Sequence, residues 1–323
     1  MDARVILLSA TPYNKTKTDL SSQLRLFVDE KTNIGSRDFG TLRTLLQQTY
    51  PRNWYASFAR IPAALFSADV RVRNVVHLGW RCGAGADPMT TRLHRWFEEY
   101  RPHLMQSLTY VTYRPASWNG RIPKLGLQPL VDGFERLLGQ GASVKQAMDR
   151  HPNAHALAFK KSAYNWLSFG REEAPCYDAD GAAIAQTKYG STYYQSTKLA
   201  DAALLVLNGK LQFAYWVAIG DDFDVTQWMF DELPVNLAAV AQGFGRDLRA
   251  AANGLWRAMK VNVSFKLNAG KRVGNFNLSH MRDVTDVIDL TTLGIIGERK
   301  LWEDIELLHT QTVRTLVGDE PEE

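Results

Sequence analysis

Apolar residues recur at helical spacing through much of the second half of the chain, and this pattern constrains the fold more than any other feature. In segment 193–220 the recurring positions are Leu199, Ala203, Leu207, Leu211 and Tyr215. The Asn208-Gly209 pair interrupts this apolar face, which predicts that the helix is divided in two. The second half is therefore expected to be mainly helical.

Two further helices are predicted in the same half. After Pro234, a favourable residue for a first helical turn, apolar residues between 237 and 259 share one face. A last helix is predicted over 299–317, where leucine and isoleucine residues again recur at helical spacing.

The first half of the chain contains shorter apolar runs. The run 4–8 ends at Ser9 and is typical of a buried parallel strand, and the valine-rich segment 70–78 predicts another strand. Helices are expected at 19–28 and 41–48. The expected fold is α+β, with a short strand-rich N-terminal part followed by a mainly helical domain.

The chain is mildly basic, with a formal net charge of +4, but its charge is unevenly distributed. Residues 38–130 carry twelve Lys/Arg against five Asp/Glu, whereas residues 131–323 carry twenty against twenty-five. Aromatic residues alternate with arginines in the first of these segments, which is typical of a surface that binds a polyanion such as nucleic acid. A solvated basic face around aromatic core residues is the alternative interpretation.

Several classes of protein are disfavoured by what the sequence lacks. With Cys82 and Cys176 as the two cysteines, neither a disulfide framework nor a four-thiolate zinc site is expected. The longest apolar stretch, 202–220, is interrupted by polar residues and falls short of the roughly 20 apolar residues of a membrane span. The first residues do not resemble a secretory signal, so a cytoplasmic protein with reduced thiols and no membrane partner is expected.

The motifs of common nucleotide-binding and hydrolytic enzymes are also missing. Neither Gly-Lys pair, at 209–210 and 270–271, has the spacing of a phosphate-binding loop. No Gly-x-Gly-x-x-Gly, Gly-x-Ser-x-Gly or His-Glu-x-x-His occurs. His151 and His155 predict a surface turn rather than a metal site, because no third ligand is nearby in the sequence.

Segment 1–37 contains the strings Val-Ile-Leu-Leu-Ser-Ala-Thr-Pro-Tyr-Asn-Lys and Asp-Leu-Ser-Ser-Gln-Leu-Arg-Leu-Phe. Together they resemble the Ser-Ala-Thr motif region of superfamily-two, Swi/Snf-type helicases. The resemblance implies that Ser9, Ala10 and Thr11 end a strand of a RecA-like lobe and help couple ATP hydrolysis to movement on DNA. That family's phosphate-binding loop precedes the motif, and only a few residues precede it here, so no ATPase activity is expected from this segment alone.

From residue 38 onward the resemblance changes. The chain contains Phe-Gly-Thr-Leu-Arg-Thr-Leu-Leu from Phe39, Trp-Tyr-Ala-Ser-Phe-Ala-Arg-Ile-Pro from Trp54, Phe-Asp-Glu-Leu-Pro-Val from Phe230 and Val-Gly-Asn-Phe-Asn from Val273. In this order the strings resemble the end of the catalytic domain and the target-recognition region of single-chain adenine-specific DNA methyltransferases of restriction-modification systems. The resemblance implies a helicase-like fragment (1–37), a basic methyltransferase-edge-like segment (38–130) and a mainly helical target-recognition-like domain (131–323).

The chain departs from this family where catalysis is expected. Such methyltransferases hold a flipped adenine with an Asn/Asp/Ser-Pro-Pro-aromatic tetrapeptide, and no two prolines are adjacent in this chain. The resemblance therefore implies a DNA-recognition module with no catalytic residues, no cofactor of its own and double-stranded DNA as its partner. The alternative is a subunit of an adenine-specific methyltransferase or helicase-containing restriction enzyme. A methyltransferase or helicase chain would complete that enzyme, with S-adenosylmethionine as cofactor; a structural protein without a DNA role is a third interpretation.

Two groups of residues are candidates for DNA contacts. Phosphate contacts are expected from arginines of the basic segment, namely Arg60, Arg71, Arg73, Arg114 and Arg121. Base contacts are expected from a polar aromatic stretch, namely Lys188, Tyr189, Tyr193, Tyr194 and Lys198. Structural ion pairs are the alternative for each arginine, and packing at a helix start is the alternative for the tyrosines.

Overall fold

The computed structural model describes residues 3–9, 46–66, 73–81, 83–163, 165–220 and 222–312, with residues 3–9 described by their backbone alone. The chain divides into two compact units. The first comprises Met1–Gly139 and Val217–Asp221, and the second comprises Gln140–Trp216 and Asp222–Glu323. This division falls after the boundary expected at residue 130, because helix α3 (Gln128–Gly139) belongs to the first unit.

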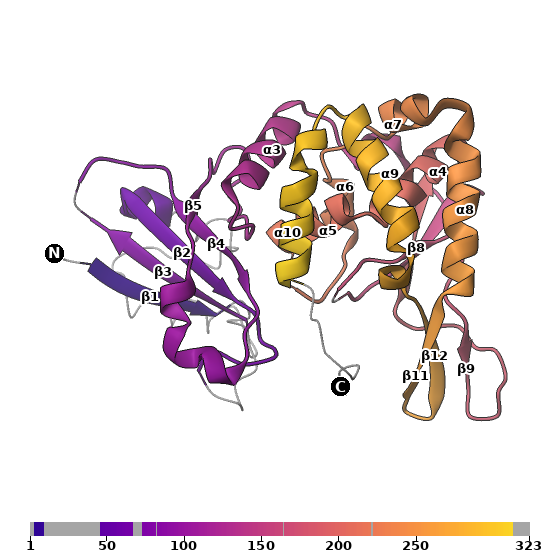
Figure 1. The fold of residues 1–323 in the computed structure, drawn as a ribbon, viewed down its shortest axis with the longest axis horizontal. Helices are drawn as coiled ribbons and strands as arrows, with labels where there is room; N and C mark the ends of the chain where they lie inside the picture. The colour runs from indigo at the N-terminus through magenta and orange to yellow at the C-terminus, as the bar shows by residue number, and fades with distance from the viewer. Residues whose placement is uncertain are drawn as a thin grey trace. The chain divides into compact units, whose positions relative to one another are not determined.

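A five-stranded sheet forms the centre of the first unit (Figure 1). Its strands are β1 (Ala3–Ser9), β2 (Arg52–Phe58), β3 (Asn74–Trp80), β4 (Met89–His94) and β5 (Val111–Thr112), in the order β1-β3-β2-β4-β5. The strand expected at 4–8 is present, but it pairs antiparallel with β3, so the expected parallel pairing is wrong. An apolar run indicates that a strand is buried and does not encode the direction of its neighbour.

Aromatic and histidine side chains from this sheet are buried in the interior of the first unit. Tyr55 and Phe58 on β2 are fully buried, and the Tyr55 ring stacks on the ring of His77 with centroids 4.8 Å apart. The Nε2 atom of His77 lies 2.9 Å from Oδ1 of Asn53. Burial lowers the pKa of His77 and the pKa of His94 to about 4, so both rings are neutral at pH 7.

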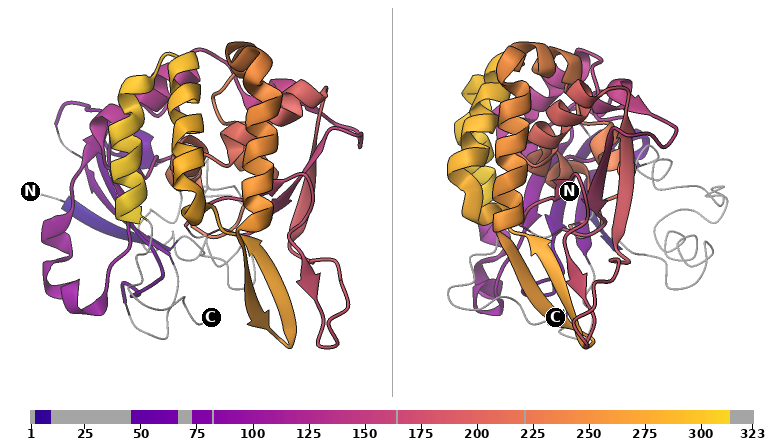
Figure 2. Two further views of the ribbon diagram at one scale, coloured as in Figure 1. Left: turned by 45° about the vertical axis from the view of Figure 1, so that its right-hand side comes forward. Right: turned by 90° about the vertical axis from the view of Figure 1, so that its right-hand side faces the viewer.

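The second unit combines two small sheets with a group of helices (Figures 1 and 2). The sheets have the orders β6-β10-β7-β8 and β11-β12-β9. The strands are β6 (Met148–Asp149), β7 (Ala156–Lys160), β8 (Phe169–Gly170), β9 (Cys176–Tyr177), β10 (Tyr189–Tyr194), β11 (Val263–Asn268) and β12 (Lys271–Phe276). The helices are α4 (Thr197–Leu207), α5 (Lys210–Ile219), α6 (Gln227–Asp231), α7 (Leu237–Phe244), α8 (Leu248–Val261), α9 (Arg282–Ile295) and α10 (Trp302–Thr312). The end of α5, from Val217 onward, belongs to the first unit. With the sheet of the first unit, this arrangement confirms the expected α+β fold.

Several boundaries differ from the sequence-based expectation. The helix expected over 237–259 is divided in two, because Gly245 has a φ of 58° and ends α7 before α8 begins. The last helix begins at Trp302 after a short 3-10 turn rather than at residue 299. The helix expected at 19–28 and residues 313–317 lie outside the described residues.

The expected division between α4 and α5 is confirmed, and buried polar side chains stabilise it. The side chain of Asn208 accepts a hydrogen bond from the backbone N–H of Phe169 (2.9 Å) and donates one to the carbonyl of the same residue (2.8 Å). Asp289, which comes from α9, accepts the backbone N–H of Lys210 at 2.8 Å and so caps the start of α5. In the described part of the chain no single helix is long and apolar enough to cross a membrane. Only α4 and α5 together pass that test, bent by 70°.

Candidate nucleic-acid interface

Cationic side chains line one side of helix α8. Arg249, Arg257 and Lys260 are exposed, and their spacing of eight and three residues places them on one side of the helix. The opposite side carries buried apolar residues, including Leu255 and Met259, which pack into the core of the second unit. The amphipathic pattern of α8 therefore fixes which way its cations point.

A buried carboxylate organises the start of this cationic side. Asp201 on α4 is 4% exposed, and its two oxygens pair with Nη2 of Arg171 (2.9 Å) and Nη1 of Arg249 (2.7 Å). Arg171 also donates a hydrogen bond to Oδ1 of Asn253 on α8 at 2.8 Å. Asp201 therefore neutralises one of the two guanidinium groups that it faces.

The hairpin β11–β12, which we call the ribbon, continues this surface and projects beyond the helices of the second unit (Figure 2). Its antiparallel register runs from Val263 opposite Phe276 to Asn268 opposite Lys271. The two turn residues between them, Ala269 and Gly270, have φ angles of 48° and 76°, which indicates a tight type I′ turn. All residues of 267–272, which we call the ribbon tip, are exposed.

The third strand of this sheet braces the ribbon. Tyr177 on β9 lies opposite Arg272, and the guanidinium of Arg272 lies over the ring of Phe265 (5.1 Å) and that of Tyr177 (6.0 Å). The backbone N–H of Gly274 donates to the carbonyl of Pro175 at 2.8 Å. A Cβ at position 274 would come within 2.4 Å of that oxygen, so this close approach requires glycine.

The charge of this region differs from that of the rest of the second unit. Residues 248–282 contain seven Lys/Arg and no Asp/Glu, although 131–323 as a whole is net acidic. Two acidic residues, Asp178 and Asp180, follow β9 on the side of the ribbon tip. Oδ1 of Asp178 accepts the backbone N–H groups of Asp180 (3.0 Å) and Ala182 (2.8 Å), which orders this loop.

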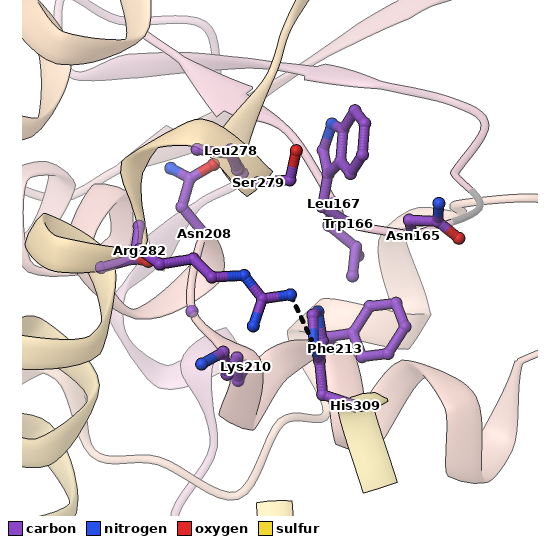
Figure 3. A pocket seen from close by; sticks show the side chains of 12 residues that line it. Asn165, Trp166, Leu167, Asn208, Lys210, Phe213, Leu278, Ser279, Arg282 and His309 are labelled. Atoms are coloured by element: carbon purple, nitrogen blue, oxygen red, sulfur yellow. Dashed lines mark hydrogen bonds between the residues drawn. The ribbon is translucent and has the colours of Figure 1, made fainter. Parts of the chain in front are cut away.

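A small cavity with apolar and charged lining residues lies among α5, α9 and α10, within the second unit (Figure 3). The buried ammonium group of Lys210 pairs there with Asp286 at 2.6 Å and also with Glu306. Nη2 of Arg282 lies 3.2 Å from Nδ1 of His309. Burial, followed by the charge of Arg282, lowers the pKa of His309 to about 3, so its neutral ring accepts a hydrogen bond from the guanidinium.

This cavity has a volume of about 30 Å³, which is room for at most a few water molecules. Its charged groups interact with one another, so we assign it to the packing of the helices rather than to ligand binding. Among the described residues, no group of three or more His, Cys, Asp or Glu side chains is placed to hold a metal ion.

The arginines expected to contact phosphates lie in different environments. Arg60, Arg73 and Arg121 are half-buried, and each interacts with another group of the protein. Arg71 lies outside the described residues.

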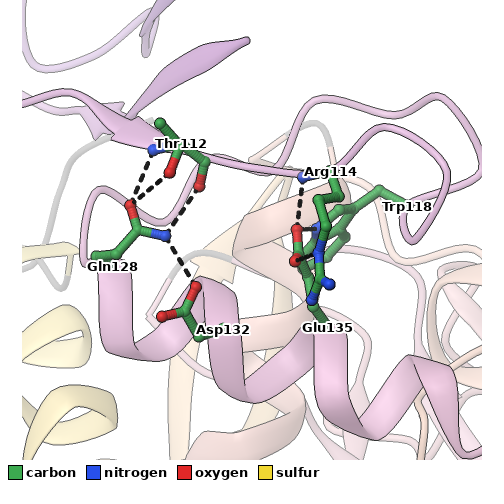
Figure 4. Close-up of polar contacts among 6 residues, drawn as sticks. All are labelled: Thr112, Arg114, Trp118, Gln128, Asp132 and Glu135. Atoms are coloured by element: carbon green, nitrogen blue, oxygen red, sulfur yellow. Dashed lines mark hydrogen bonds and ion pairs between the residues drawn. The ribbon is translucent and has the colours of Figure 1, made fainter. Parts of the chain in front are cut away.

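Arg114 forms an ion pair with a buried carboxylate (Figure 4). Its Nε lies 2.5 Å from Oε2 of Glu135, and its backbone N–H donates to Oε1 at 2.7 Å. Trp118 donates its indole N–H to the same carboxylate at 3.2 Å. For Arg114 the structure thus shows the ion pair that was the alternative interpretation.

Of the residues expected to contact bases, two are buried. Tyr194 is 0% and Tyr189 is 7% exposed, because β10 lies between β6 and β7 and packs against α4. This burial favours packing, the alternative interpretation for these two tyrosines. Lys188 and Lys198 are exposed and Tyr193 is half-buried, so these three stay candidates.

The helicase-like motif falls mostly outside the described residues. Ser9 is the last residue of β1 and lies opposite Asn74 on β3, whereas Ala10 and Thr11 are among the residues that are not described. The role that the resemblance implies for this motif stays a prediction.

The cationic side of α8 and the ribbon were missed by the sequence analysis. Acidic residues elsewhere in 131–323 cancel this local excess of positive charge. A shorter window would have revealed 248–282 as a stretch without acidic residues. The Asn-Ala-Gly turn between two short alternating segments was the available signal for the hairpin.

Comparisons of the chain with family models, with curated proteins and with solved structures found no match.

Proposed function

We propose that this chain is the DNA-recognition module of a restriction-modification adenine methyltransferase system, and that it lacks methyltransferase and ATPase motifs of its own. The observation that carries the proposal is the acid-free segment 248–282, which presents cations along α8 and on the projecting ribbon. The order of the sequence strings from Phe39 to Val273 supports the link to adenine methylation.

The dimensions of this surface suit a duplex backbone. Helix α8 has 14 residues and is therefore about 21 Å long, a length along which a DNA strand presents several phosphates. Arg257 and Lys260 are exposed near the end of α8 that leads into the ribbon. Cations in this arrangement attract phosphates of any sequence, and each contact releases bound counterions from the DNA.

The first test measures binding and its salt dependence. We expect the chain to bind a labelled 30-base-pair duplex in fluorescence anisotropy, with affinity that falls steeply as salt rises from 50 to 200 mM. Each phosphate contact contributes about 0.9 to the slope of log affinity against log salt. The double variant Arg257→Gln/Lys260→Gln should lower that slope by about 2 and weaken binding to all sequences alike.

The control variant is Arg299→Gln/Lys300→Gln, which removes an exposed Arg and Lys elsewhere in the second unit and should leave the slope unchanged. The triple variant Arg71→Gln/Arg73→Gln/Arg121→Gln tests the basic segment in the same assay. If the slope of log affinity against log salt fell in this triple variant alone, the result would show that the interface lies on the first unit. Absence of duplex binding at 50 mM salt would contradict the proposed function.

The alternative, an enzyme subunit completed by another chain, is favoured by one feature of the first unit. Phe66, Phe97, Tyr100 and Met105 are 43–58% exposed. They lie on two segments that Arg101 joins through its hydrogen bonds to backbone carbonyls of the 61–66 segment. Exposed apolar groups of this size favour contact with another protein. Methyl transfer from labelled S-adenosylmethionine to mixed DNA by this chain alone would contradict both interpretations.

A further inference from the structure

We propose that the ribbon tip, residues 267–272, enters the major groove of duplex DNA and contacts base edges through Asn268, Lys271 and Arg272. This inference rests on the proposed DNA-binding function and adds the segment that determines sequence preference. It is carried by the shape of the ribbon, the exposure of its tip and the chemistry of its side chains.

The shape of the ribbon matches the groove. A two-stranded hairpin is one of the two protein elements that fit the major groove, which is about 12 Å wide and about 8.5 Å deep. Because β9 pairs with β12 at Arg272 and Val273, the two-stranded part of the ribbon is its turn end, residues 268–271. The type I′ turn at Ala269-Gly270 keeps the end of the ribbon narrow. The strands are six residues each, or about 20 Å at roughly 3.3 Å per residue, so the tip extends well beyond the helices.

The side chains of the tip match the donors and acceptors of base edges. Asn is the residue that pairs in bidentate fashion with adenine, and Lys and Arg pair with guanine. Asn268, Lys271 and Arg272 are all exposed, and Leu267, which lies opposite Arg272, is 78% exposed. An exposed leucine at this position offers an apolar contact to a thymine methyl group.

Arg272 is oriented before any ligand arrives. Its guanidinium lies over the rings of Phe265 and Tyr177, whose centroids are 5.9 Å apart. These rings restrict the rotamers of the side chain, so binding costs less conformational entropy. Within the described part of the chain, no carboxylate forms an ion pair with Arg272 or Lys271.

The acidic residues near the tip separate its role from that of α8. Asp178 and Asp180 follow β9 on the side of the tip and reduce its positive charge, whereas among the described residues no carboxylate forms an ion pair with Arg257 or Lys260 on α8. A weakly charged tip attracts phosphates less and discriminates bases through hydrogen bonds. We therefore assign phosphate contacts to Arg257 and Lys260, and base contacts to the tip.

The decisive variant is Asn268→Ala, because it removes a base-reading side chain without changing charge. The full-length chain is incubated with a library of duplexes that contain a randomised segment, and the bound fraction is sequenced. We expect the wild type to select a preferred sequence and Asn268→Ala to lose about tenfold or more of the preference at one position. Its salt slope and its thermal midpoint should equal those of the wild type.

Two further arms complete the design. The variant Lys271→Gln/Arg272→Gln should lose its sequence preference at guanine positions. The variant Arg257→Gln/Lys260→Gln should keep its sequence preference and show a lower slope of log affinity against log salt. For the unmodified protein, a preferred duplex in which 7-deazaguanine replaces guanine lacks the major-groove N7 acceptor and should bind more weakly. Because this measurement uses the wild-type protein, it does not depend on whether a variant folds.

The outcomes separate the two proposals. If the wild type binds duplexes and the tip variants keep its full sequence preference, the tip assignment is wrong and the DNA-binding function stands. Binding without any sequence preference, or binding indifferent to 7-deazaguanine, would equally overturn the tip assignment. Failure of the wild type to bind any duplex would overturn the proposed function itself, and the tip assignment with it.

Discussion

At the residue scale, the start of α5 depends on one carboxylate and on one missing side chain. Asp289 is 2% exposed and accepts the backbone N–H of Lys210. A Cβ at Gly209 would lie 2.0 Å from Oδ1 of Asp289, so an alanine there and the present position of the carboxylate are mutually exclusive. The Asn-Gly pair was recognisable in the sequence as a break, but its distant partner on α9 was not.

We predict that Gly209→Ala lowers the free energy of unfolding by about 1–3 kcal/mol, because the carboxylate must leave the backbone amides that it caps. Urea denaturation followed by circular dichroism measures this change. The matched control is Gly254→Ala inside α8, where an added Cβ meets no atom within 4 Å. That control should gain about 0.5–1 kcal/mol from helix propensity. Equal stability of Gly209→Ala and the wild type would contradict the assigned cap.

At the element scale, helices were predicted better than strands. Helix α4 and the division from α5 follow from apolar periodicity and from Asn208-Gly209, both of which are local signals. The antiparallel direction of β1 depends on β3, which lies far along the chain, and so local sequence could not reveal it. The burial of Tyr189 and Tyr194 likewise results from β10 lying inside its sheet, although a polar aromatic stretch favours an exposed site.

The pairing of β1 with β3 also predicts the effect of deleting residues 1–37. We expect the remaining chain to fold, because Tyr55 and Phe58 of β2 and His77 of β3 supply the described interior of the first unit. The deletion leaves one edge of β3 without its partner, and an unpaired edge promotes association between chains. Size-exclusion chromatography with light scattering should therefore show more self-association than for the full chain. Loss of tertiary structure in near-ultraviolet circular dichroism would show instead that β1 is essential for folding.

At the scale of the whole molecule, buried histidines in both units and a buried aspartate in the second unit change the folding stability in opposite directions as pH falls. Burial lowers the pKa of His77 and of His94 in the first unit to about 4. In the second unit, burial lowers the pKa of His309 to about 3 but raises the pKa of Asp289 to about 7. The folded state thus excludes protons from the histidines and binds one at Asp289 at a higher pH than the unfolded chain does.

We predict that the first unit loses stability before the second as pH falls from 7 to 4. Unfolded histidines take up protons below pH ~6.5, so each buried neutral histidine costs about 3 kcal/mol at pH 4. In the second unit, His309 likewise lowers the free energy of unfolding as pH falls. This loss is offset, because the contribution of Asp289 to that free energy increases as pH falls from about 7 toward 4. Hydrogen exchange with mass spectrometry, corrected for intrinsic rates, should show protection lost first in β2 and β3. Earlier loss of protection in α4 and α8 would contradict this order.

The cap of α5 has a consequence for the order in which the chain is made. Lys210 and Asp289 are separated by 79 residues, so the ribosome delivers α4 and α5 well before the carboxylate that joins them. At about 5–20 residues per second, the first amides of α5 wait on the order of 4–16 s with water as their only acceptor. The carboxylate cap of α5 can therefore form only after α9 has emerged. A nascent chain stalled before residue 289 would present this junction uncapped to chaperones and proteases.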